Sequence, residues 1–522
     1  MNFLISYICF LLLSFSLLFS HSNRCNQSFL KIRSRPELSH TYTSQEENFQ
    51  IHYDIEGVNA PSLADQDNDG VPDYVQLVSE IAEDSRNMLV NMMGYLQEPD
   101  DDDGLYDIFI LNQSAWGWNV VEDSNTGISY VKIDNDYNGN NFESEYCLNN
   151  LDKMRISVAH EYFHAIQRAY RPNPITDHDF FLEMSAMWFE DLMVPECNDY
   201  LSFVDALSYS IFNNPLQSFD GSDLTSSQSQ SNYGYSMALF LHYLVSLDKS
   251  IENSFNSITV RNIWESYSTG ISARDAIVGI VENEIGDSFA TIWSDFISRN
   301  MFCGVFNYFN QDIYYYSDQQ YIEPISIETS DYIFTDENQL YVSDIKPYSA
   351  NILAIGIMDD MLIESYLSDF EKYSGYYSVL GNSVAHDKIN DSLLELNLKS
   401  GDKFYIILSS ELEDAQIKIS VQTEPLPINQ TIISGVYPNP IVMNENLNIN
   451  VQNNLDVNNL KIEFYDITGK MIGTYLNSST LIQGNNIINI ALSRYMTSSG
   501  IYFLVFYDGD RKIAKQKIIF IK

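Results

Sequence analysis

The stretch VAHEYFHAIQ, residues 158–167, determines how the rest of this sequence is interpreted. It places His160 and His164, two of eight histidines in 522 residues, four positions apart, with Glu161 directly after the first. On a helix, residues four apart lie on one face, so both imidazoles can reach one ion while Glu161 faces a water bound beside them. The pattern predicts a zinc site. The alternative is an ordinary half-buried amphipathic helix whose histidines are satisfied by hydrogen bonds.

A third ligand separates these two interpretations, because zinc hydrolases use three protein ligands and leave the fourth position to water. The motif HExxHxxGxxH is excluded, since Gln167 and Tyr170 stand where it needs glycine and histidine. Eighteen residues separate His164 from Glu183, which begins a helical run in FFLEMSAMWFED at 180–191. Glu183 is therefore the predicted third zinc ligand.

HExxH, this spacing, and a glutamate followed by serine and alanine resemble the gluzincins, the clan that includes thermolysin-like and aminopeptidase-like zinc proteases. YGYSMALFLHYL at 233–244 is similar to the tyrosine-bearing helix start that gluzincins place across the cleft. Residues 51–305 thus look like a family of secreted bacterial metalloproteases. The resemblance implies an α+β zincin-like catalytic domain, with a small β-sheet and a helical lower half.

The resemblance also implies roles for single residues. Glu161 would be the general base that takes a proton from water and passes it to the leaving amine. Tyr233 would polarise the substrate carbonyl and stabilise the oxyanion, with Tyr235 as the alternative. The GAMEN motif of the aminopeptidase-like members is absent from the sequence, which favours an endopeptidase.

Two neighbouring features would complete such a site. GISYVKID at 127–134 is the predicted edge strand, which would pair with an extended peptide. Glu190 and Asp191, one to two turns after Glu183, would either orient the ligands or form a solvated acidic helix end.

DQDNDGVPD at 65–73 is a second metal signal. Its acids take positions 1, 3, 5 and 9 of a calcium loop, with Gly70 at the sharp turn: Asp65, Asp67, Asp69 and Asp73. Gln76 replaces the bidentate glutamate of an EF-hand, so the loop looks more like the DxDxDG repeats of secreted bacterial and thrombospondin type 3 segments. A structural Ca²⁺ is predicted, with an Asx-turn as the alternative. PDDDDGLYD at 99–107 is either a further calcium site or a solvated loop.

Charge limits the partners of the chain. Lys and Arg number 28 against 71 Asp and Glu, which gives a formal net charge of −43. A nucleic acid or an anionic membrane would therefore be repelled at long range. We expect a protein or peptide substrate and cations as partners, and the oligomeric state is left open.

The N-terminal residues 1–22 contain a long apolar run and predict a secretory signal peptide, although the leader lacks the usual Lys or Arg; an uncleaved anchor is the alternative. No later segment approaches the roughly 18 apolar residues of a membrane span. Residues 23–50 form an N-terminal segment. Four cysteines remain after the signal and allow three pairings, with one or two disulfides expected after export: Cys25, Cys147, Cys197 and Cys303.

The C-terminal part of the chain reads as β-structure. Short alternating segments predict a β-sandwich-like accessory domain over 320–424, and EPLPIN at 424–429 indicates a linker, which is predicted over 425–434. Residues 435–522 closely resemble the C-terminal sorting domain of the type IX secretion system, itself a small β-sandwich. The alternative is a carbohydrate-binding or immunoglobulin-like appendage. The resemblance implies the type IX machinery as a partner and a secreted or cell-surface location.

These features together predict a secreted zinc-dependent endopeptidase. The competing hypothesis is a calcium-stabilised surface adhesin whose zinc site is structural or vestigial. Glu161 favours the enzyme, because a purely structural zinc needs no base.

Overall fold

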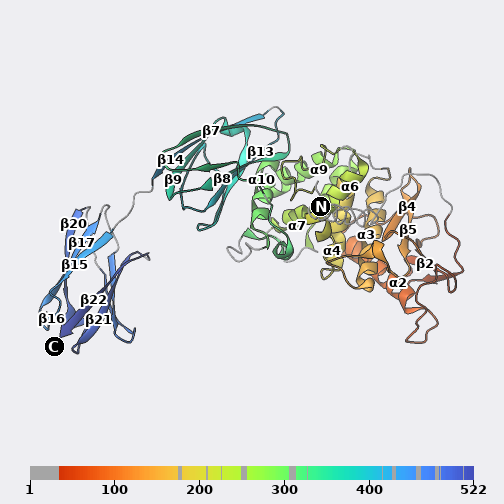
Figure 1. Ribbon diagram of the computed structural model, residues 1–522. Helices are drawn as coiled ribbons and strands as arrows, with labels where there is room; N and C mark the ends of the chain where they lie inside the picture. Colours follow the sequence, from red (N-terminus) through yellow and green to blue (C-terminus); the bar gives the residue numbers. More distant parts are fainter. Residues whose placement is uncertain are drawn as a thin grey trace, which may run out of the picture. The chain divides into compact units, whose positions relative to one another are not determined.

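The computed structural model describes residues 35–522 except 174–178, 207–209, 225, 249–255, 305–312, 326, 414, 426–430, 454–459, 477–480, 482–483 and 510 (Figure 1). The predicted signal peptide, and residues 23–34 of the N-terminal segment, lie outside this range. The chain divides into two compact units, Met1–Glu424 and Pro425–Lys522. The protein is therefore multidomain, and β-sheets recur along most of its length.

The first unit begins with a five-stranded sheet of order β1-β2-β3-β5-β4. Its strands are β1 (His40–Thr43), β2 (Phe49–Tyr53), β3 (Tyr106–Leu111), β4 (Gly117–Asp123) and β5 (Ile128–Asp134). β2, β3 and β5 run parallel, and β1 and β4 are antiparallel to their neighbours. Alternate residues such as Ile108 and Val131 face the helices and are fully buried, as the two-residue period of a strand requires.

The predicted edge strand is wrong. All of residues 127–134 except Gly127 form β5, which has a strand on each side, and the edge position belongs to β4. Both faces of β5 are covered, since Tyr130 and Val131 point in opposite directions and are both fully buried. A strand that is buried on both faces is rich in apolar residues, as interior strands are. The sequence alone did not show that β4, its more polar neighbour, is the edge strand.

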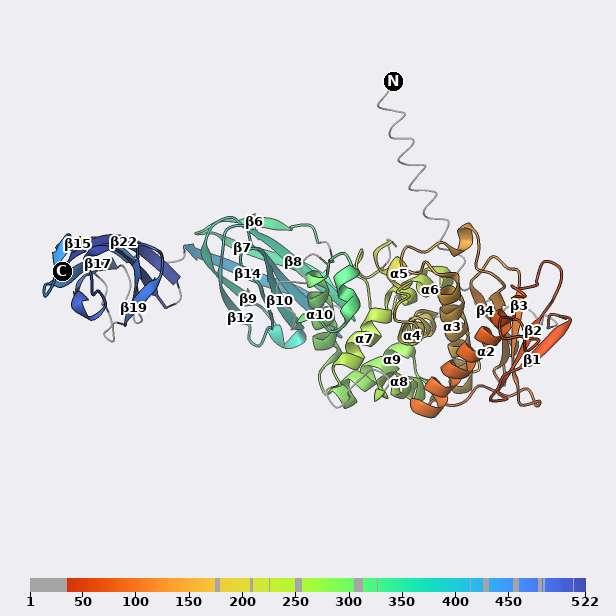
Figure 2. The same cartoon turned by 90° about the horizontal axis from the view of Figure 1, so that it is seen from below.

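Helices fill the middle of the first unit. They are α2 (Asp73–Arg86), α3 (Asn150–Tyr170), α4 (Asp179–Met193), α5 (Leu201–Ala206), α6 (Ser227–Ser236), α7 (Ala238–Ser246), α8 (Thr259–Ser268), α9 (Ala273–Ile280) and α10 (Phe289–Arg299). α3 lies against the sheet, and α4 lies between α3 and α6 (Figure 2). α3 begins at a cap in which the Asn149 side chain accepts a hydrogen bond from the Leu151 amide. Both α3 and α4 are buried on nearly every side, which holds their polar residues inside the protein.

Glycine allows α6 to approach α4 closely. A Cβ at Gly234 would lie 2.3 Å from the carbonyl oxygen of Phe180, closer than any side chain permits. Phe180 is in the first turn of α4, three residues before Glu183. The contact therefore fixes α6 directly over the helix that carries the predicted third ligand.

A β-sandwich completes the first unit. Its sheets have the orders β11-β10-β13-β8-β6 and β12-β9-β14-β7. The strands are β6 (Asp331–Ile333), β7 (Asn338–Ile345), β8 (Ser349–Ile357), β9 (Met361–Leu367), β10 (Ser374–Leu380), β11 (Ala385–Lys388), β12 (Leu393–Leu398), β13 (Lys403–Ser410) and β14 (Ala415–Pro425).

This sandwich shares its core with the helices. α10 packs on the sheet that contains β10 and β13, Ser298 and Ser378 share a hydrogen bond of 2.6 Å, and His386 Nε2 lies 3.0 Å from an Asp295 oxygen. Ile352 and Ile407 belong to the same apolar cluster as the helices. β8 and β13 are buried on both faces: one face packs inside the sandwich, and the other packs against α10.

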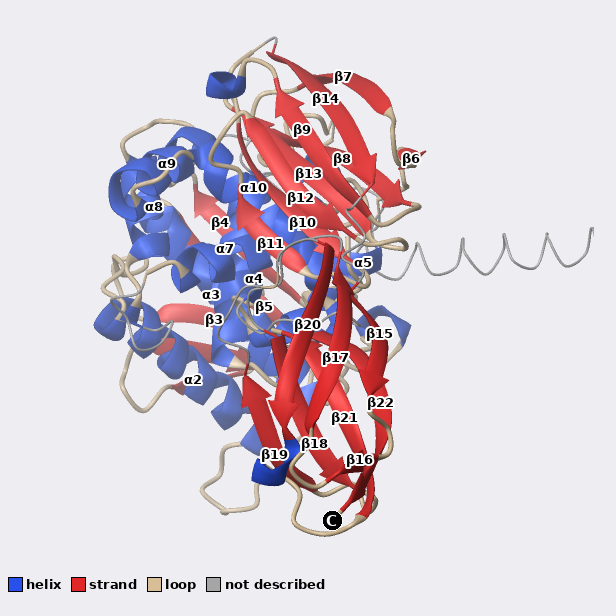
Figure 3. Cartoon of the chain, turned by 90° about the vertical axis from the view of Figure 1, so that its left-hand side faces the viewer, coloured by secondary structure: helices blue, strands red, loops and turns tan. Residues whose placement is uncertain are grey.

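The second unit is a separate β-structure with its own core (Figure 3). Its sheets have the orders β15-β17-β20 and β16-β22-β21-β18-β19. The strands are β15 (Thr431–Tyr437), β16 (Ile441–Val442), β17 (Asn446–Asn453), β18 (Leu460–Asp466), β19 (Met471–Leu476), β20 (Gly484–Ala491), β21 (Gly500–Asp508) and β22 (Arg511–Ile521). β14 extends to Pro425 and β15 starts at Thr431, so strands occupy both ends of the predicted linker 425–434.

Candidate metal centre

Three predicted ligands come together between α3 and α4. His160 Nε2 lies 3.2 Å from His164 Nε2 and 3.2 Å from Glu183 Oε2, and His164 Nε2 lies 3.5 Å from the same oxygen. Two donors that each lie about 2.0–2.1 Å from a tetrahedral zinc ion are about 3.3–3.4 Å apart. The three donor atoms therefore have the spacing of one face of a zinc coordination tetrahedron.

The other nitrogen of each histidine already has a partner. His160 Nδ1 lies 2.9 Å from Glu190 Oε2, and His164 Nδ1 lies 2.9 Å from Gln167 Oε1. The Gln167 amide is oriented by its own donation to the Leu182 carbonyl at 2.9 Å, so its oxygen must face His164. Each Nδ1 is therefore the donor, and in the neutral rings each Nε2 presents a lone pair.

Three lone pairs that face each other at this distance require a positive charge between them. Without a metal, a proton supplies it. Burial disfavours the imidazolium, but hydrogen bonds to Glu183 and Glu190 outweigh burial and raise the pKa of His160 to about 10. Burial likewise disfavours ionised Glu183, but His164 and His160 lower the pKa of its carboxyl to about 2. The donor set fits zinc, which would replace the proton that the metal-free site holds.

Glu190 and Asp191 are not a solvated helix end, since they are 1% and 0% exposed. Glu190 orients His160, as described above. Asp191 points elsewhere: it accepts a hydrogen bond from the Tyr316 hydroxyl and lies 3.1 Å from His242 Nε2. The ring of Tyr316 stacks on His242 with 3.9 Å between centroids. Asp191 therefore ties the end of α4 to α7 and to the chain that leads into the sandwich.

The side chain of Glu161 lies under the first residue of the edge strand. A Cβ at Gly117 would lie 2.4 Å from Glu161 Cγ and 2.9 Å from Oε1, so only glycine fits there. Asn119, two residues along β4, donates a hydrogen bond of 3.4 Å to the Glu161 carbonyl. The predicted base thus lies beside His160 at the start of β4.

The structure separates the two candidate tyrosines. The Tyr233 hydroxyl donates to the Phe219 carbonyl at 3.0 Å and to the Ser218 carbonyl at 3.4 Å, in a loop before α6. The Tyr235 ring lies 6.2 Å from the His160 ring, centroid to centroid. Residues two apart on a helix point in nearly opposite directions, so only one of the two can face the ligands. The geometry favours Tyr235 over Tyr233, which the sequence had placed first.

Solvent is largely excluded from the ligands. The side chains of His160, His164 and Glu183 are 4%, 1% and 1% exposed. Such burial strengthens charge interactions with a bound ion. Glu161 is itself 1% exposed, so a ligand can reach it only if the groups over the site move.

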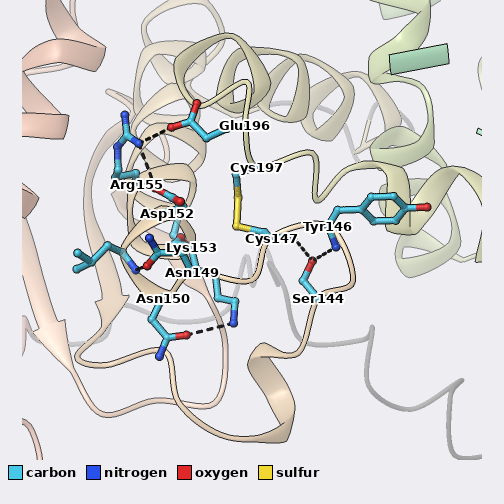
Figure 4. The surroundings of a disulfide bond; sticks show 12 residues. Ser144, Tyr146, Cys147, Asn149, Asn150, Asp152, Lys153, Arg155, Glu196 and Cys197 are labelled. Atoms are coloured by element: carbon cyan, nitrogen blue, oxygen red, sulfur yellow. Dashed lines mark hydrogen bonds and ion pairs between the residues drawn. A yellow bond between two sulfur atoms is a disulfide. The ribbon is translucent and has the colours of Figure 1, made fainter. Parts of the chain in front are cut away.

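A disulfide joins the ends of the two ligand-bearing helices (Figure 4). Cys147, just before α3, is bonded to Cys197, just after α4, with 4.6 Å between their Cα atoms. The Ser144 hydroxyl accepts a hydrogen bond of 2.9 Å from the Cys147 amide and holds the loop before the bridge. Cys303 is fully buried and its Sγ lies 3.4 Å from Asn300 Oδ1, and Cys25 lies outside the described residues. Of the bonds that the sequence allowed, the structure shows Cys147–Cys197 among the described residues.

The predicted calcium loop is only partly convergent. Ligand atoms of Asp65, Asp67 and Asp73 lie within 4.8 Å of one another. Asp69 instead accepts hydrogen bonds from the Val71 amide at 2.8 Å and from Gln76 Nε2 at 2.7 Å. Three carboxylates so close together suit a hard cation, and Asp69 shapes the loop around them. Asp100, Asp101 and Asp103, in the second acidic stretch, are grouped in the same way.

Sequence reasoning missed two contributors to these sites. Gln167 was considered only as a departure from the metzincin pattern, although its position three residues after His164 places it on the same helical face. Arg35 was not singled out. Its guanidinium contacts the carboxylates of Asp107 in β3, Glu122 in β4 and Asp101 in the loop before β3, and nothing local in the sequence indicates these long-range contacts.

Comparison with known proteins identifies the second unit. Residues 435–522 match the family model of the secretion system C-terminal sorting domain. The chain is therefore exported by type IX secretion to the cell surface or the extracellular space, and the secretion machinery is a partner. Among the described residues, no helix combines the length and apolar character needed to cross a bilayer.

The remaining comparisons carry no argument about the first unit. No curated protein matches the chain. Solved structures align at low similarity: the periplasmic g-type lysozyme inhibitor PliG of Salmonella Typhimurium has 11% identity and a TM-score of 0.16, over 19% of this chain and 100% of that chain. The adhesin domain of Epf from Streptococcus pyogenes has 10% identity and a TM-score of 0.17, over 35% and 77% respectively. Such TM-scores support no argument about fold or activity.

Proposed function

We propose that the first unit is a zinc-dependent endopeptidase of the gluzincin type, which acts on extracellular proteins. One observation carries this proposal: the lone pairs of His160 Nε2, His164 Nε2 and Glu183 Oε2 converge at 3.2–3.5 Å, with both Nδ1 protons committed elsewhere. Bound zinc would supply Lewis acidity and lower the pKa of a water to about 7.

The residues of the chain provide the rest of the chemistry. Glu161 would take the proton from the attacking water and deliver it to the leaving nitrogen. Tyr235 would donate a hydrogen bond to the oxygen that gains negative charge as the carbonyl is attacked. Glu190 and Gln167 would keep the two imidazoles in the tautomer that leaves Nε2 free for the ion.

The position of the edge strand supports cleavage within a chain. β4 pairs with β5 on one side, and no described strand pairs with its other side. Gly117 at its start lies directly on Glu161. An extended peptide that adds to this open edge would bring a peptide bond past the base while both of its ends stay outside.

The burial of the ligands favours a second candidate, a structural zinc in a surface adhesin. A closed site with ligands at most 4% exposed is the usual state of a structural ion. Glu161 distinguishes the two candidates, because a structural site does not need an additional carboxylate beside its ligands.

Metal analysis combined with hydrolysis tests the proposal. The purified protein should contain one zinc per chain and cleave casein; a zinc chelator should abolish cleavage, and added zinc should restore it. Zinc at one per chain without cleavage of casein or of a peptide library would support the structural alternative. A protein that holds no zinc would refute both.

We also propose a structural Ca²⁺ at Asp65, Asp67 and Asp73. The loop leads directly into α2, whose first residue is Asp73, so the ion would fix the start of that helix.

A further inference from the structure

Two carboxylates lie close together inside the first unit. Asp191, at the end of α4, is fully buried, and Asp318, in the 3₁₀ helix η9 (Ser317–Tyr321), is 6% exposed. The Asn198 amide nitrogen lies between them and donates to Asp318 Oδ2 at 3.1 Å and to Asp191 Oδ1 at 3.2 Å. One amide therefore spans both carboxylates, and two like charges face each other where water screens them little.

The surroundings supply little positive charge to balance this pair. His242 Nε2, on α7, lies 3.1 Å from Asp191 Oδ2. Within the described part of the chain, neither carboxylate pairs with a lysine or an arginine. One imidazolium balances only one of the two negative charges, so the other carboxylate favours uptake of a proton. The remaining contacts come from neutral hydroxyl groups: that of Tyr316 donates to Asp191, that of Tyr200 donates to Asp318 Oδ2 at 3.0 Å, and that of Ser317 donates to Asp318 Oδ1 at 3.3 Å.

Asp318 is the carboxyl group that takes up the proton. Burial, and then the charge of Asp191, raise the pKa of Asp318 to about 6, although Tyr200 and His242 oppose the shift. An aspartate in an unfolded chain titrates near pH 3.9, so the folded protein holds this proton more tightly than the unfolded chain. The resulting stabilisation is complete below about pH 4 and is lost as the pH rises through about 6.

Tyr200 connects this carboxyl pair to the candidate metal centre. It directly precedes α5, in which the Phe203 ring packs on the Tyr235 ring with 4.7 Å between centroids. The Tyr235 ring is in turn next to His160, at 6.2 Å. Phe203 and Tyr235 are 2% and 1% exposed, so both belong to the groups that close the site. Because Cys197 is held by its disulfide, movement of this cover would start in the residues after it.

We propose that Asp318, Asp191 and Tyr200 form a proton-dependent latch on α5. With Asp318 protonated, the two carboxyl groups no longer repel each other, and the latch holds α5 closed over the candidate metal centre. With Asp318 ionised, repulsion loosens η9 and the start of α5, so the cover can move aside. The latch does not depend on any catalysis; that its release admits a substrate rests on the proposed zinc peptidase.

Asp318→Asn tests the latch, because an amide has the shape of the protonated carboxyl group and cannot ionise. Between pH 5 and pH 8, the unfolding equilibrium constant of the full chain should rise about tenfold more in the parent than in Asp318→Asn. Denaturant unfolding at each pH measures this difference. An equal pH dependence of the two proteins would overturn the latch, since Asp318 would then be an ordinary hydrogen-bond acceptor.

Asp295 provides a matched control with the opposite sign. It also accepts a hydrogen bond from a buried tyrosine, Tyr243, at 2.6 Å, but Arg299 Nε donates to the same carboxylate at 2.8 Å. Burial opposes ionisation of Asp295, but the hydrogen bond from His386 and the charge of Arg299 outweigh burial and lower the pKa of this carboxyl. Asp295→Asn should therefore be less stable than the parent at pH 8, because it removes a stabilised carboxylate.

Hydrogen exchange in the parent locates the effect and does not require that any variant folds. After correction for the intrinsic effect of pH on exchange, protection should fall about tenfold between pH 5 and pH 8 in peptides that cover residues 198–204 and 316–321. Protection of α10 should stay the same. Equal protection of the first two segments at both pH values would overturn the latch.

Hydrolysis separates the latch from the peptidase. Asp318→Asn should cleave casein more slowly than the parent at pH 8 and at about the parent rate at pH 5, because its latch stays closed. Cleavage by a parent whose exchange does not change with pH would refute the latch alone. The expected exchange difference in a chain that cleaves nothing would support the latch and refute the peptidase.

Discussion

Single residues decide whether the site between α3 and α4 can hold a metal at all. The motif places two imidazoles on one helical face, but the choice of ring nitrogen depends on Glu190 and Gln167, which bind the two Nδ1 atoms. If either partner were lost, its histidine could rotate or change tautomer and present a proton to the ion. The ligand set is therefore defined by five residues, of which three would touch the metal.

Replacement of the base should separate binding from chemistry. Glu161→Gln should keep one zinc per chain but lose about 10²-fold or more in peptide hydrolysis, because Glu161 is not a ligand. Glu183→Ala should lose zinc and hydrolysis together, since it removes a donor. Zinc content by mass spectrometry and hydrolysis rates on the same samples give the comparison. A folded Glu161→Gln protein that cleaves casein at the parent rate would show that Glu161 is not the base.

The two tyrosines offer a matched pair on one helix. Tyr235→Phe should keep zinc and the fold but lose an oxyanion donor, raising the barrier by on the order of 3 kcal/mol. Tyr233→Phe removes a hydrogen bond to the Phe219 carbonyl and should instead lower the free energy of unfolding by about 1 kcal/mol. Turnover numbers and denaturant unfolding of both variants measure these effects. The reverse pattern would restore Tyr233 as the functional residue.

At the residue scale, the sequence predicted the candidate ligands and base whose positions follow from the spacing of residues on a helix. His160, Glu161 and His164 follow from local spacing, and Glu183 from its distance to the motif. The choice between Tyr233 and Tyr235 could not follow, because it depends on which side of α6 meets α4, and Gly234 against Phe180 sets that contact. Gln167 could have been identified, since a residue three positions after a histidine shares its face.

At the scale of elements, the Cys147–Cys197 disulfide joins the start of α3 to the end of α4. The bridge links residues 50 positions apart in the sequence, and both ligand helices lie inside this loop. The geometry of the candidate metal centre therefore depends on a covalent link as well as on packing.

Removal of the bridge should weaken both the fold and the site. In a Cys147→Ser, Cys197→Ser double variant the free energy of unfolding should fall by about 4 kcal/mol, the loop-closure value for this separation. Zinc affinity should fall too, since the two helices are freer to separate. Denaturant unfolding and zinc competition measure these changes. Reductant should destabilise the parent and leave the double variant unchanged; equal sensitivity of the two would contradict the prediction.

In the candidate calcium loop, we expect different effects from substitution of Asp67 and of Asp69. Asp67→Ala should abolish the stabilisation that calcium gives, which is about 2.7 kcal/mol at a hundredfold excess over Kd, because Asp67 belongs to the convergent group. Asp69→Ala should lower stability with or without calcium, because Asp69 binds Val71 and Gln76. Melting temperatures with calcium and with chelator test the contrast. A calcium shift that survives Asp67→Ala would place the ion elsewhere.

Elements were predicted well where their period was clear and poorly where their neighbours decided the outcome. The run VQLVSEIAEDSRNMLVNMM at 75–93 repeats apolar side chains at helical spacing, and it forms most of α2 and a π-helical turn, Asn87–Met92. β5 was taken for an edge because strand order is not encoded in one strand. The shared core between α10 and the sandwich was also missed, since alternation shows that a face is buried but not what buries it.

At the scale of the whole molecule, the chain divides into two compact units, each with its own core. The first unit joins the five-stranded sheet, the helices and the sandwich through a common core, and the sorting domain has its own core. Export and the proposed chemistry are thus assigned to parts of the chain that do not depend on each other for packing.

A chain that ends at Pro425 should fold and stay inside the cell envelope. It retains the complete first unit, so its zinc content and melting temperature should match those of the parent. Without the sorting domain it should accumulate in the periplasm. Fractionation of cells that express each form tests this. Normal secretion of the shortened chain would mean that export signals lie outside residues 426–522.

The Cys147–Cys197 bridge also determines where in the cell the protein can mature. Thiols remain reduced in the cytoplasm and pair after export, so the newly made chain carries α3 and α4 without their covalent link. Zinc would then be retained most firmly only beyond the inner membrane. The proposed protease would therefore be restrained during synthesis by the chemistry of the compartment, before the sorting signal acts.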